Sequence, residues 1–202
     1  MGLSPEDKKR LFGKLKEGSE RSRRFGDVLT NETPRGCALV AGAFLEQQLL
    51  ILLQARMINR AAANKFDFFF EGVGPLGSFA ARTHLSCLLG FISKSVYQDL
   101  CVIREIRNRF AHSSENMDFD DSGIKTDCAK LYHYMKRRVD IPRAQFIGAV
   151  SGVDLVLEYL IFDSQHSTTP EDGPEEISQE LRRQYDMYQA KIGIFPPVEP
   201  PL

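Results

Sequence analysis

Hydrophobic residues follow a helical pattern along most of this chain. The longest such run, CALVAGAFLEQQLLILLQARMI at residues 37–58, follows the break NETPRG and is apolar on nearly every side. It holds few β-branched residues and no proline, and it is too long for a strand. The pattern therefore predicts a buried central helix.

Capping residues mark the next two helices. Ser78 suits the N-cap of a helix over about residues 78–89, and Gly90 suits the left-handed position that follows a helix. Ser93 then suits the N-cap of a helix that runs to about residue 112.

Two more helices are predicted downstream. Asp121 or Ser122 would cap a helix through IKTDCAKLYHYMKRR, residues 124–138. Pro142 suits the first turn of a last long helix over residues 142–162, because its missing N–H is harmless there. No segment alternates as a strand would. We therefore predict an all-α protein: a single multi-helix bundle domain with no sheet.

The chain divides into three predicted parts. Residues 1–30 form a basic helix, capped by Ser4, that packs on or flanks the core. We interpret the charges of this helix as a solvated face. Residues 31–165 form the helical core domain. Residues 166–202 are turn-rich and acidic and end in prolines, which predicts an extension with one short helix.

Composition and charge exclude several classes of protein. The formal net charge of −1 over 202 residues gives no global positive field, which disfavours a free-standing DNA-binding protein. The N-terminal segment has no apolar signal region, and the longest uninterrupted run, LLILL, is too short to cross a bilayer. We therefore expect a cytoplasmic protein without membrane contact. The four cysteines are widely spaced, and we expect reduced thiols, no metal and no cofactor.

One arginine interrupts an apolar stripe on the helix that ends near residue 112. At helical spacing Arg107 falls in the middle of the stripe formed by Val96, Leu100, Ile103, Ile106 and Phe110. A solvated arginine does not belong there. Arg107 is therefore expected to be buried with a partner or to line a cleft or subunit interface. Glu46, the lone acid of the central helix, is the predicted partner, in a pair that is either structural or part of a site.

His112 lies five positions beyond Arg107, about 140° around the helix. On one helix the two side chains do not converge closely. His112 either only caps the C-terminus of the helix, or shares a site with Arg107 where the helix ends or where two copies meet across a two-fold axis.

The stretch RNRFAH, residues 107–112, resembles the motif of arginine, four residues and histidine in HEPN domains. HEPN domains are small helical bundles, often dimeric; many are metal-independent RNases and others are non-catalytic binding modules. By this resemblance Arg107 would hold a phosphate and His112 would act in proton transfer, with Asn108 adjacent. Ser114 stands where RNase toxins often carry a tyrosine.

A second resemblance covers about residues 35–160. The segments RGCALVAGAFLEQQL, FFEGVGPLGSFAART, LLGFISKSVYQDLCVIREIRNRFAH and PRAQFIGAV, in this order, resemble the mannitol operon repressor family of bacteria. The resemblance implies an all-helical, dimeric protein linked to transcriptional repression. That family lacks a recognisable DNA-reading motif, and this sequence shows no helix-turn-helix.

The leading hypothesis is a cytoplasmic homodimeric regulator that takes part in repression through a protein partner rather than by direct base readout. One alternative is a metal-independent endoribonuclease, with Arg107 and His112 catalytic and RNA as substrate. The other is a non-catalytic HEPN-like module that binds a nucleotide or a protein. The candidate ligand-binding residues are Glu46, Arg107, Asn108 and His112, and the sequence leaves open whether the protein is an enzyme.

Overall fold

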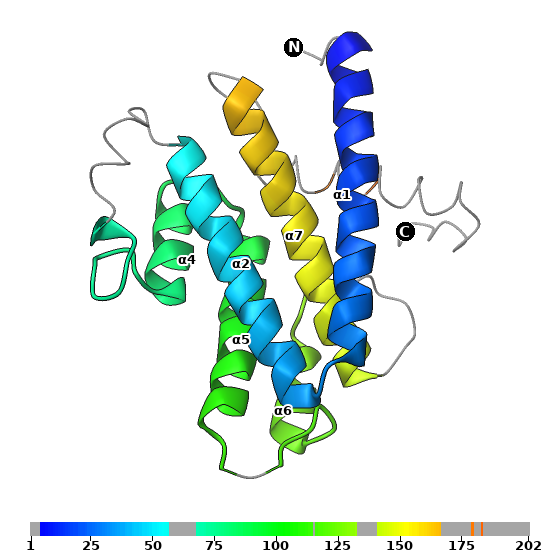
Figure 1. Ribbon diagram of the computed structural model, residues 1–202, viewed down its shortest axis with the longest axis vertical. Helices are drawn as coiled ribbons and strands as arrows, with labels where there is room; N and C mark the ends of the chain where they lie inside the picture. The colour runs from blue at the N-terminus through cyan, green and yellow to red at the C-terminus, as the bar shows by residue number, and fades with distance from the viewer. Residues whose placement is uncertain are drawn as a thin grey trace, which may run out of the picture.

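The computed structural model describes residues 5–56, 68–114, 116–132 and 141–166 and, beyond them, only Gln179 and Arg183. The helices of this part of the chain are α1 (Pro5–Asn31), α2 (Pro34–Arg56), α4 (Phe79–Leu88), α5 (Lys94–His112), α6 (Ser122–Cys128) and α7 (Pro142–His166). Within these ranges the chain contains no strand, so the predicted all-α class is confirmed (Figure 1).

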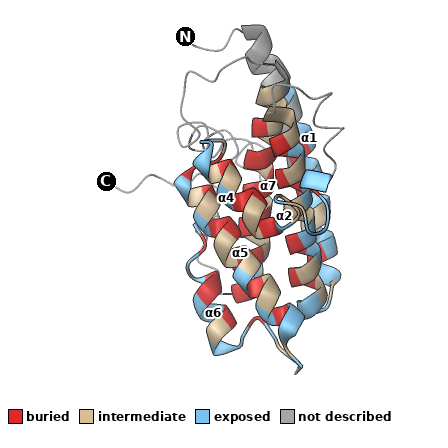
Figure 2. Ribbon diagram, turned by 90° about the vertical axis from the view of Figure 1, so that its left-hand side faces the viewer, coloured by how far each residue is buried: buried red, intermediate tan, exposed pale blue. Residues whose placement is uncertain are grey.

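The apolar helix α2 is the centre of the bundle. It packs against α7, α5 and α4, and α1 packs along α7. In Figure 1, α2 crosses the front of the molecule, with α4 and α5 on one side and α7 and α1 on the other. Figure 2 shows the buried residues on the inward faces of these helices. The core is apolar and includes Leu45, Leu49, Leu52, Ile103, Ile106, Phe110, Val150, Val153 and Leu157.

The capping residues predicted around α4 and α5 lie where the sequence placed them, whereas Asp121, the N-cap of α6, makes no capping bond with its side chain and Ser4 lies outside the described residues. The hydroxyl of Ser78 accepts a hydrogen bond from the backbone N–H of Ala81, and that of Ser93 accepts one from Val96. Gly90 has a φ of +69°, a conformation in which a Cβ would be strained. These three residues fix the start of α4, the turn after it and the start of α5.

The helix predicted over residues 124–138 ends earlier, at Cys128. The buried Asp99 of α5 explains the early end, because its carboxylate accepts a 2.7 Å hydrogen bond from the backbone N–H of Tyr132. This long-range contact turns the chain away from the helical path. The rest of the predicted helix, residues 133–138, lies outside the described residues.

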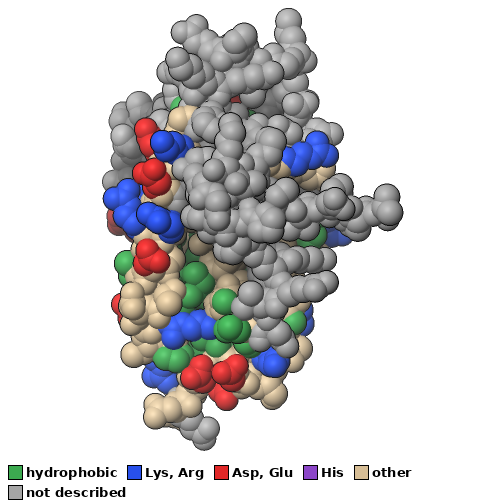
Figure 3. Space-filling view, turned by 90° about the vertical axis from the view of Figure 1, so that its right-hand side faces the viewer, with side chains coloured by type: hydrophobic (Ala, Val, Ile, Leu, Met, Phe, Trp, Pro, Cys, Tyr) green, Lys and Arg blue, Asp and Glu red, His purple; other side chains and the backbone are tan. Residues whose placement is uncertain are grey.

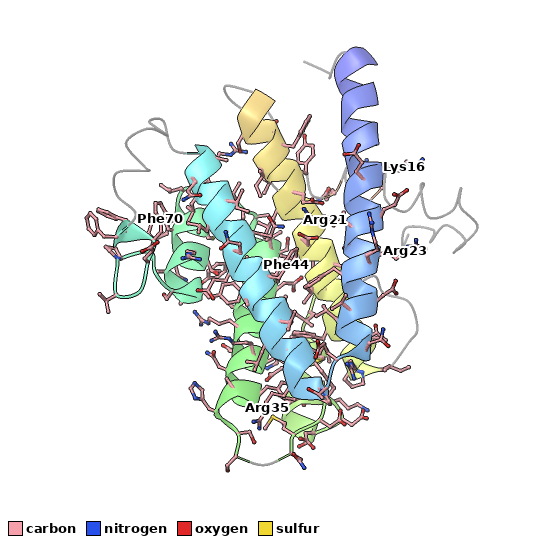
Figure 4. All side chains as sticks on the ribbon, in the orientation of Figure 1. Lys16, Arg21, Arg23, Arg35, Phe44 and Phe70 are labelled. Carbon is pink, nitrogen blue, oxygen red and sulfur yellow. The ribbon has the colours of Figure 1, made fainter. Side chains whose placement is uncertain are left out.

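The basic N-terminal helix is more than a solvated face. Arg21 of α1 forms ion pairs with Asp154 at 3.2 Å and with Glu158 at 2.5 Å, both on α7. Its guanidinium carbon also lies 5.9 Å from the centre of the Phe44 ring of α2 (Figure 4). The interpretation as a solvated face is therefore corrected for Arg21, which ties α1 to α7 and covers Phe44.

In the part of the chain that the structure describes, two helices are long and apolar enough to cross a membrane, α2 and α7. In the most apolar window of each, however, 50% of the α2 residues and 56% of the α7 residues are buried inside the protein. Their apolarity is that of core helices. The predicted boundaries at residues 30 and 165 stay predictions, and the C-terminal extension over 166–202 lies outside the described residues except for His166, Gln179 and Arg183.

Asp154 predicts a pH-dependent stability. Burial, and next the negative charge of Glu158, raises the pKa of Asp154 from 3.8 to about 7, although Arg21 opposes the shift. Between these two pH values the folded state holds a proton that the unfolded state has lost, so the contribution of Asp154 to the free energy of unfolding decreases as pH rises.

We expect Asp154→Asn to become more stable relative to wild type by roughly 1–4 kcal/mol between pH 4 and pH 8, because the amide stays neutral. Urea denaturation of both proteins across this range measures the difference. A difference between the two proteins that does not change with pH would contradict the prediction.

Candidate functional site

Arg107 lies where α5 packs tightly against α2. A Cβ built at Gly42 would lie 2.8 Å from Cγ of Arg107 and 3.3 Å from its Cβ. Gly42 is buried, and Arg107 is half-buried. The absence of a side chain at Gly42 therefore lets the stem of Arg107 lie across α2, in the seam between the two helices.

The guanidinium of Arg107 is only partly satisfied. Its Nη1 donates a 2.9 Å hydrogen bond to Oδ1 of the adjacent Asn108. Its Nε is shielded from solvent and has no hydrogen-bond partner in the described part of the chain. An unpaired buried donor is costly, so this atom is a place where a further acceptor would be favourable.

The predicted ion pair between Arg107 and Glu46 is wrong within one chain. Glu46 lies one turn beyond Gly42 on the same side of α2, but no ion pair within the described ranges joins it to Arg107. The physical reason is local: Asn108, next to Arg107 in the sequence, supplies an acceptor for its guanidinium. The carboxylate of Glu46 is half-buried and also has no ion-pair partner in this part of the chain.

Arg82 is a buried arginine that the sequence analysis missed. It donates hydrogen bonds to the carbonyl oxygens of Leu76, Phe70 and Glu46, at 2.8, 2.7 and 3.1 Å. These bonds fix the loop before α4, on which Phe70 lies (Figure 4), against α2. The glycines and proline of that loop predicted a turn, but nothing in the local sequence indicated that an arginine would hold it.

His112 is exposed at the last residue of α5. No hydrogen bond in the described ranges joins it to Arg107. The adjacent carbonyl of Ser113 accepts a 2.7 Å hydrogen bond from Arg35 of α2, which ties the end of α5 to the start of α2. Arg109 pairs with the buried Asp127 of α6 at 3.2 Å. His112 is thus the one candidate residue that lies outside the seam.

The seam brings together three of the four candidate residues: Arg107 and Asn108 from α5, and Glu46 from α2. Chemically, it offers a cation with a spare donor and a carboxylate about one turn away. Such an arrangement suits binding to a polar or charged partner. Among the described residues, no three His, Cys, Asp or Glu side chains come together as metal ligands would.

Comparison with known proteins gives one match. A family model described as mannitol repressor matches residues 27–146, which is more than half of the 202-residue chain. The matched region contains α2, α4 and α5 and therefore all four candidate residues. Neither the curated proteins nor the solved structures include a match.

The close contact at Gly42 can be tested with one substitution and a matched control. In Gly42→Ala the added Cβ meets the stem of Arg107, an overpacking that costs roughly 1–3 kcal/mol. In Gly13→Ala, on α1, nothing lies within 4 Å of the added Cβ, so the gain in helix propensity of about 1 kcal/mol stands alone.

Both variants gain the same helix propensity. We therefore expect Gly42→Ala to be less stable than Gly13→Ala by roughly 1–3 kcal/mol in chemical denaturation. Equal stability of the two variants would mean that α5 does not approach α2 at Gly42.

Proposed function

This chain belongs to the mannitol repressor family, and we propose that it takes part in repression of a mannitol operon as a homodimer, through a protein partner rather than by reading bases. The proposal places it in the cytoplasm, where transcription occurs in bacteria. The seam of Glu46, Arg107 and Asn108, with the nearby His112, is the proposed contact for the partner or for a small ligand.

The observation that carries this proposal is how the basic side chains are used. Proteins that bind DNA directly need arginines and lysines free to contact phosphates. Here Arg82 and Arg143 donate to backbone carbonyl groups of their own chain. A second group forms ion pairs with carboxylates: Arg21, Arg56, Arg109 and Lys130. With Arg35, which donates to the carbonyl of Ser113, seven cations are thus engaged in holding the fold.

In the C-terminal half of α1, the exposed charged side chains do not form a positive surface. Basic and acidic residues alternate there, with Lys16, Arg23 and Arg24 exposed beside Glu17, Glu20 and Asp27. Figure 3 shows the same mixture of blue and red side chains along one edge of the molecule. Mixed charge of this kind gives a weak field and supports association with a protein more than with a nucleic acid.

A second candidate function rests on a specific observation. Arg107 keeps an unpartnered donor and His112 is exposed at the end of α5, as the endoribonuclease alternative would require of a phosphate-binding group and a proton-transfer group. Against it, the two residues lie about 140° apart on a continuous helix, and no hydrogen bond joins them in the described part of the chain. The binding function therefore fits the geometry better than catalysis within one chain.

We expect the purified protein to bind mannitol-operon DNA weakly, with a strong dependence on salt and no preference for the operator over scrambled DNA. Gel shifts at low and physiological salt test this, and a reporter fused to the operon promoter tests repression in cells. Nanomolar, sequence-selective binding by the purified protein at physiological salt would overturn the role of a partner. A reporter that the protein does not repress would overturn the role in repression itself.

We also expect the wild-type protein to leave single-stranded RNA intact in the presence of a chelator. The catalytic alternative predicts the opposite, with cleavage lost in His112→Ala and kept in His84→Ala, which changes another exposed histidine, on α4. Both variants should keep the fold, because exposed side chains leave no cavity. Cleavage that disappears only in His112→Ala would replace the binding function with catalysis.

A further inference from the structure

The two ends of α1 are held differently. Its C-terminal turns belong to the core, because Leu29 is fully buried and the ring of Phe25 lies 4.2 Å from the ring of Phe44 on α2. Arg143 of α7 also donates to the carbonyl oxygens of Leu29 and Glu32. Apolar contacts and hydrogen bonds therefore fix this end of α1.

Towards its N-terminus α1 diverges from α7 (Figure 1). The two helices are still close at Gly18, where an added Cβ would lie 2.5 Å from Oε2 of Glu158. Farther out, a Cβ added at Gly13 would meet nothing within 4 Å. We call residues 5–22 the α1 arm. Gly18 and Arg21, near the end of this arm, are where it contacts α7.

One cation faces two carboxylates where the α1 arm meets α7. Arg21 pairs with Asp154 at 3.2 Å and with Glu158 at 2.5 Å. The side chain of Arg21 is 46% exposed, whereas that of Asp154 is 0% exposed. Beside Arg21, α2 contributes the uncharged ring of Phe44 (Figure 4). The contact therefore holds one excess negative charge when both carboxylates are ionised.

The second carboxylate oxygen of Asp154 favours a proton. This atom, Oδ2, is shielded from solvent and has no hydrogen-bond partner in the described part of the chain. An ionised carboxylate with such an oxygen is costly to bury. A proton on Oδ2 removes the excess charge and leaves Arg21 paired with Glu158. The docked arm is therefore more stable with Asp154 protonated than with Asp154 ionised.

We propose that Asp154 is a pH-sensitive switch: its protonated form keeps the α1 arm docked on α7, and loss of the proton to solvent releases the arm. Release returns Asp154 to water, while Phe25 and Leu29 keep the end of α1 in the core. This device belongs to the fold and does not depend on the proposed function.

Docking of the α1 arm weakens as pH rises. With the arm docked, burial first and the charge of Glu158 second raise the pKa of Asp154 from 3.8 to about 7. With the arm released, the pKa returns towards 3.8 because the burial is lost. Between these values the docked state holds a proton that the released state has lost, so docking is weakest above about pH 7. The docking equilibrium changes by at most about a thousandfold across this range.

An ordinary ion pair would depend on pH in the opposite direction. A carboxylate whose pKa is lowered by an arginine loses its pair as pH falls. Here the burial of Asp154 outweighs the attraction of Arg21, so the contact is lost as pH rises. The direction of the pH dependence therefore separates the switch from a simple ion pair.

Release of the α1 arm opens an apolar stripe on α2. Val40 and Ile51, each 37% exposed, lie on the same side of α2 as Phe44. In the docked state Arg21 covers Phe44, with its guanidinium carbon 5.9 Å from the centre of the ring. Loss of this cover joins the three apolar side chains into one exposed surface, so pH controls access to that surface.

Hydrogen exchange of the full-length chain tests the switch, with wild type and Asp154→Asn compared at the same pH. The amide of the variant stays neutral, so the α1 arm stays docked. At pH 7.5 the backbone amides of the arm should exchange at least about tenfold faster in wild type, because a released helix of this length is barely stable alone. At pH 5 the arm should exchange alike in both proteins.

Residues 25–31, at the other end of the same helix, are the internal reference. Local release accelerates the α1 arm at least about tenfold more than these residues, whereas destabilisation of the whole fold accelerates both by the same factor. Asp27→Asn, which changes an exposed acid of α1, should exchange like wild type. Equal exchange of the arm in wild type and Asp154→Asn at pH 7.5, or equal acceleration of both parts of α1, would overturn the proposal.

A second measurement follows Phe44. The chain contains no tryptophan, so Phe44→Trp places a single fluorophore under Arg21. Its emission should move to longer wavelength as pH rises, because water reaches the ring when the α1 arm is released. Adding Asp154→Asn should abolish this shift. Adding Glu158→Gln should move its midpoint to lower pH, since the charge of Glu158 helps to raise the pKa of Asp154. A shift that persists with Asp154→Asn, or a midpoint that Glu158→Gln leaves unchanged, would overturn the switch.

Discussion

Burial of the long apolar helix α2 is the constraint on which the rest of this structure depends. Four helices pack against α2, and the core they form with it consists of aliphatic and aromatic side chains. Such packing traps backbone carbonyl groups at loops and helix ends, and each needs a donor. Arginines supply these donors: Arg82 holds the loop before α4 against α2, and Arg143 of α7 donates to the carbonyl groups of Leu29 and Glu32 at the end of α1.

This use of arginine links the fold to the proposed function. A side chain that satisfies a carbonyl group or a buried carboxylate inside the protein is not available to a phosphate backbone. Arg21 and Arg109 reach the buried carboxylates of Asp154 and Asp127 in the same way. What remains at the surface is a mixed pattern of charges, which favours recognition of a protein over recognition of DNA. The described residues form no strong positive surface, yet the chain belongs to a repressor family. The two facts are compatible if a partner supplies the contact with DNA.

Arg107 has no ion pair or backbone acceptor among the described residues, unlike Arg21, Arg82 and Arg143. Its stem is held by the contact with Gly42, its Nη1 by Asn108, and its Nε has no partner within the described residues. The seam thus holds a cation with one unsatisfied donor and, about one turn along α2, the carboxylate of Glu46, which has no ion-pair partner among the described residues.

The sequence by itself determined the family and most of the helices, though not the end of α6. Ser78, Ser93 and Gly90 act through bonds and dihedral angles within a few residues, so local patterns were sufficient to place them. The sequence also showed that Arg107 interrupts an apolar stripe, because helical spacing fixes which residues share a face.

Only the tertiary structure decided what lies opposite each face. The sequence pointed to Glu46 as the partner of Arg107, but the packing placed Gly42 under its stem and Asn108 at its guanidinium. Asp99 ended the helix after Cys128 through a contact 33 residues away. Contacts of this kind depend on how helices pack, and neither propensity nor periodicity within one segment carries that information.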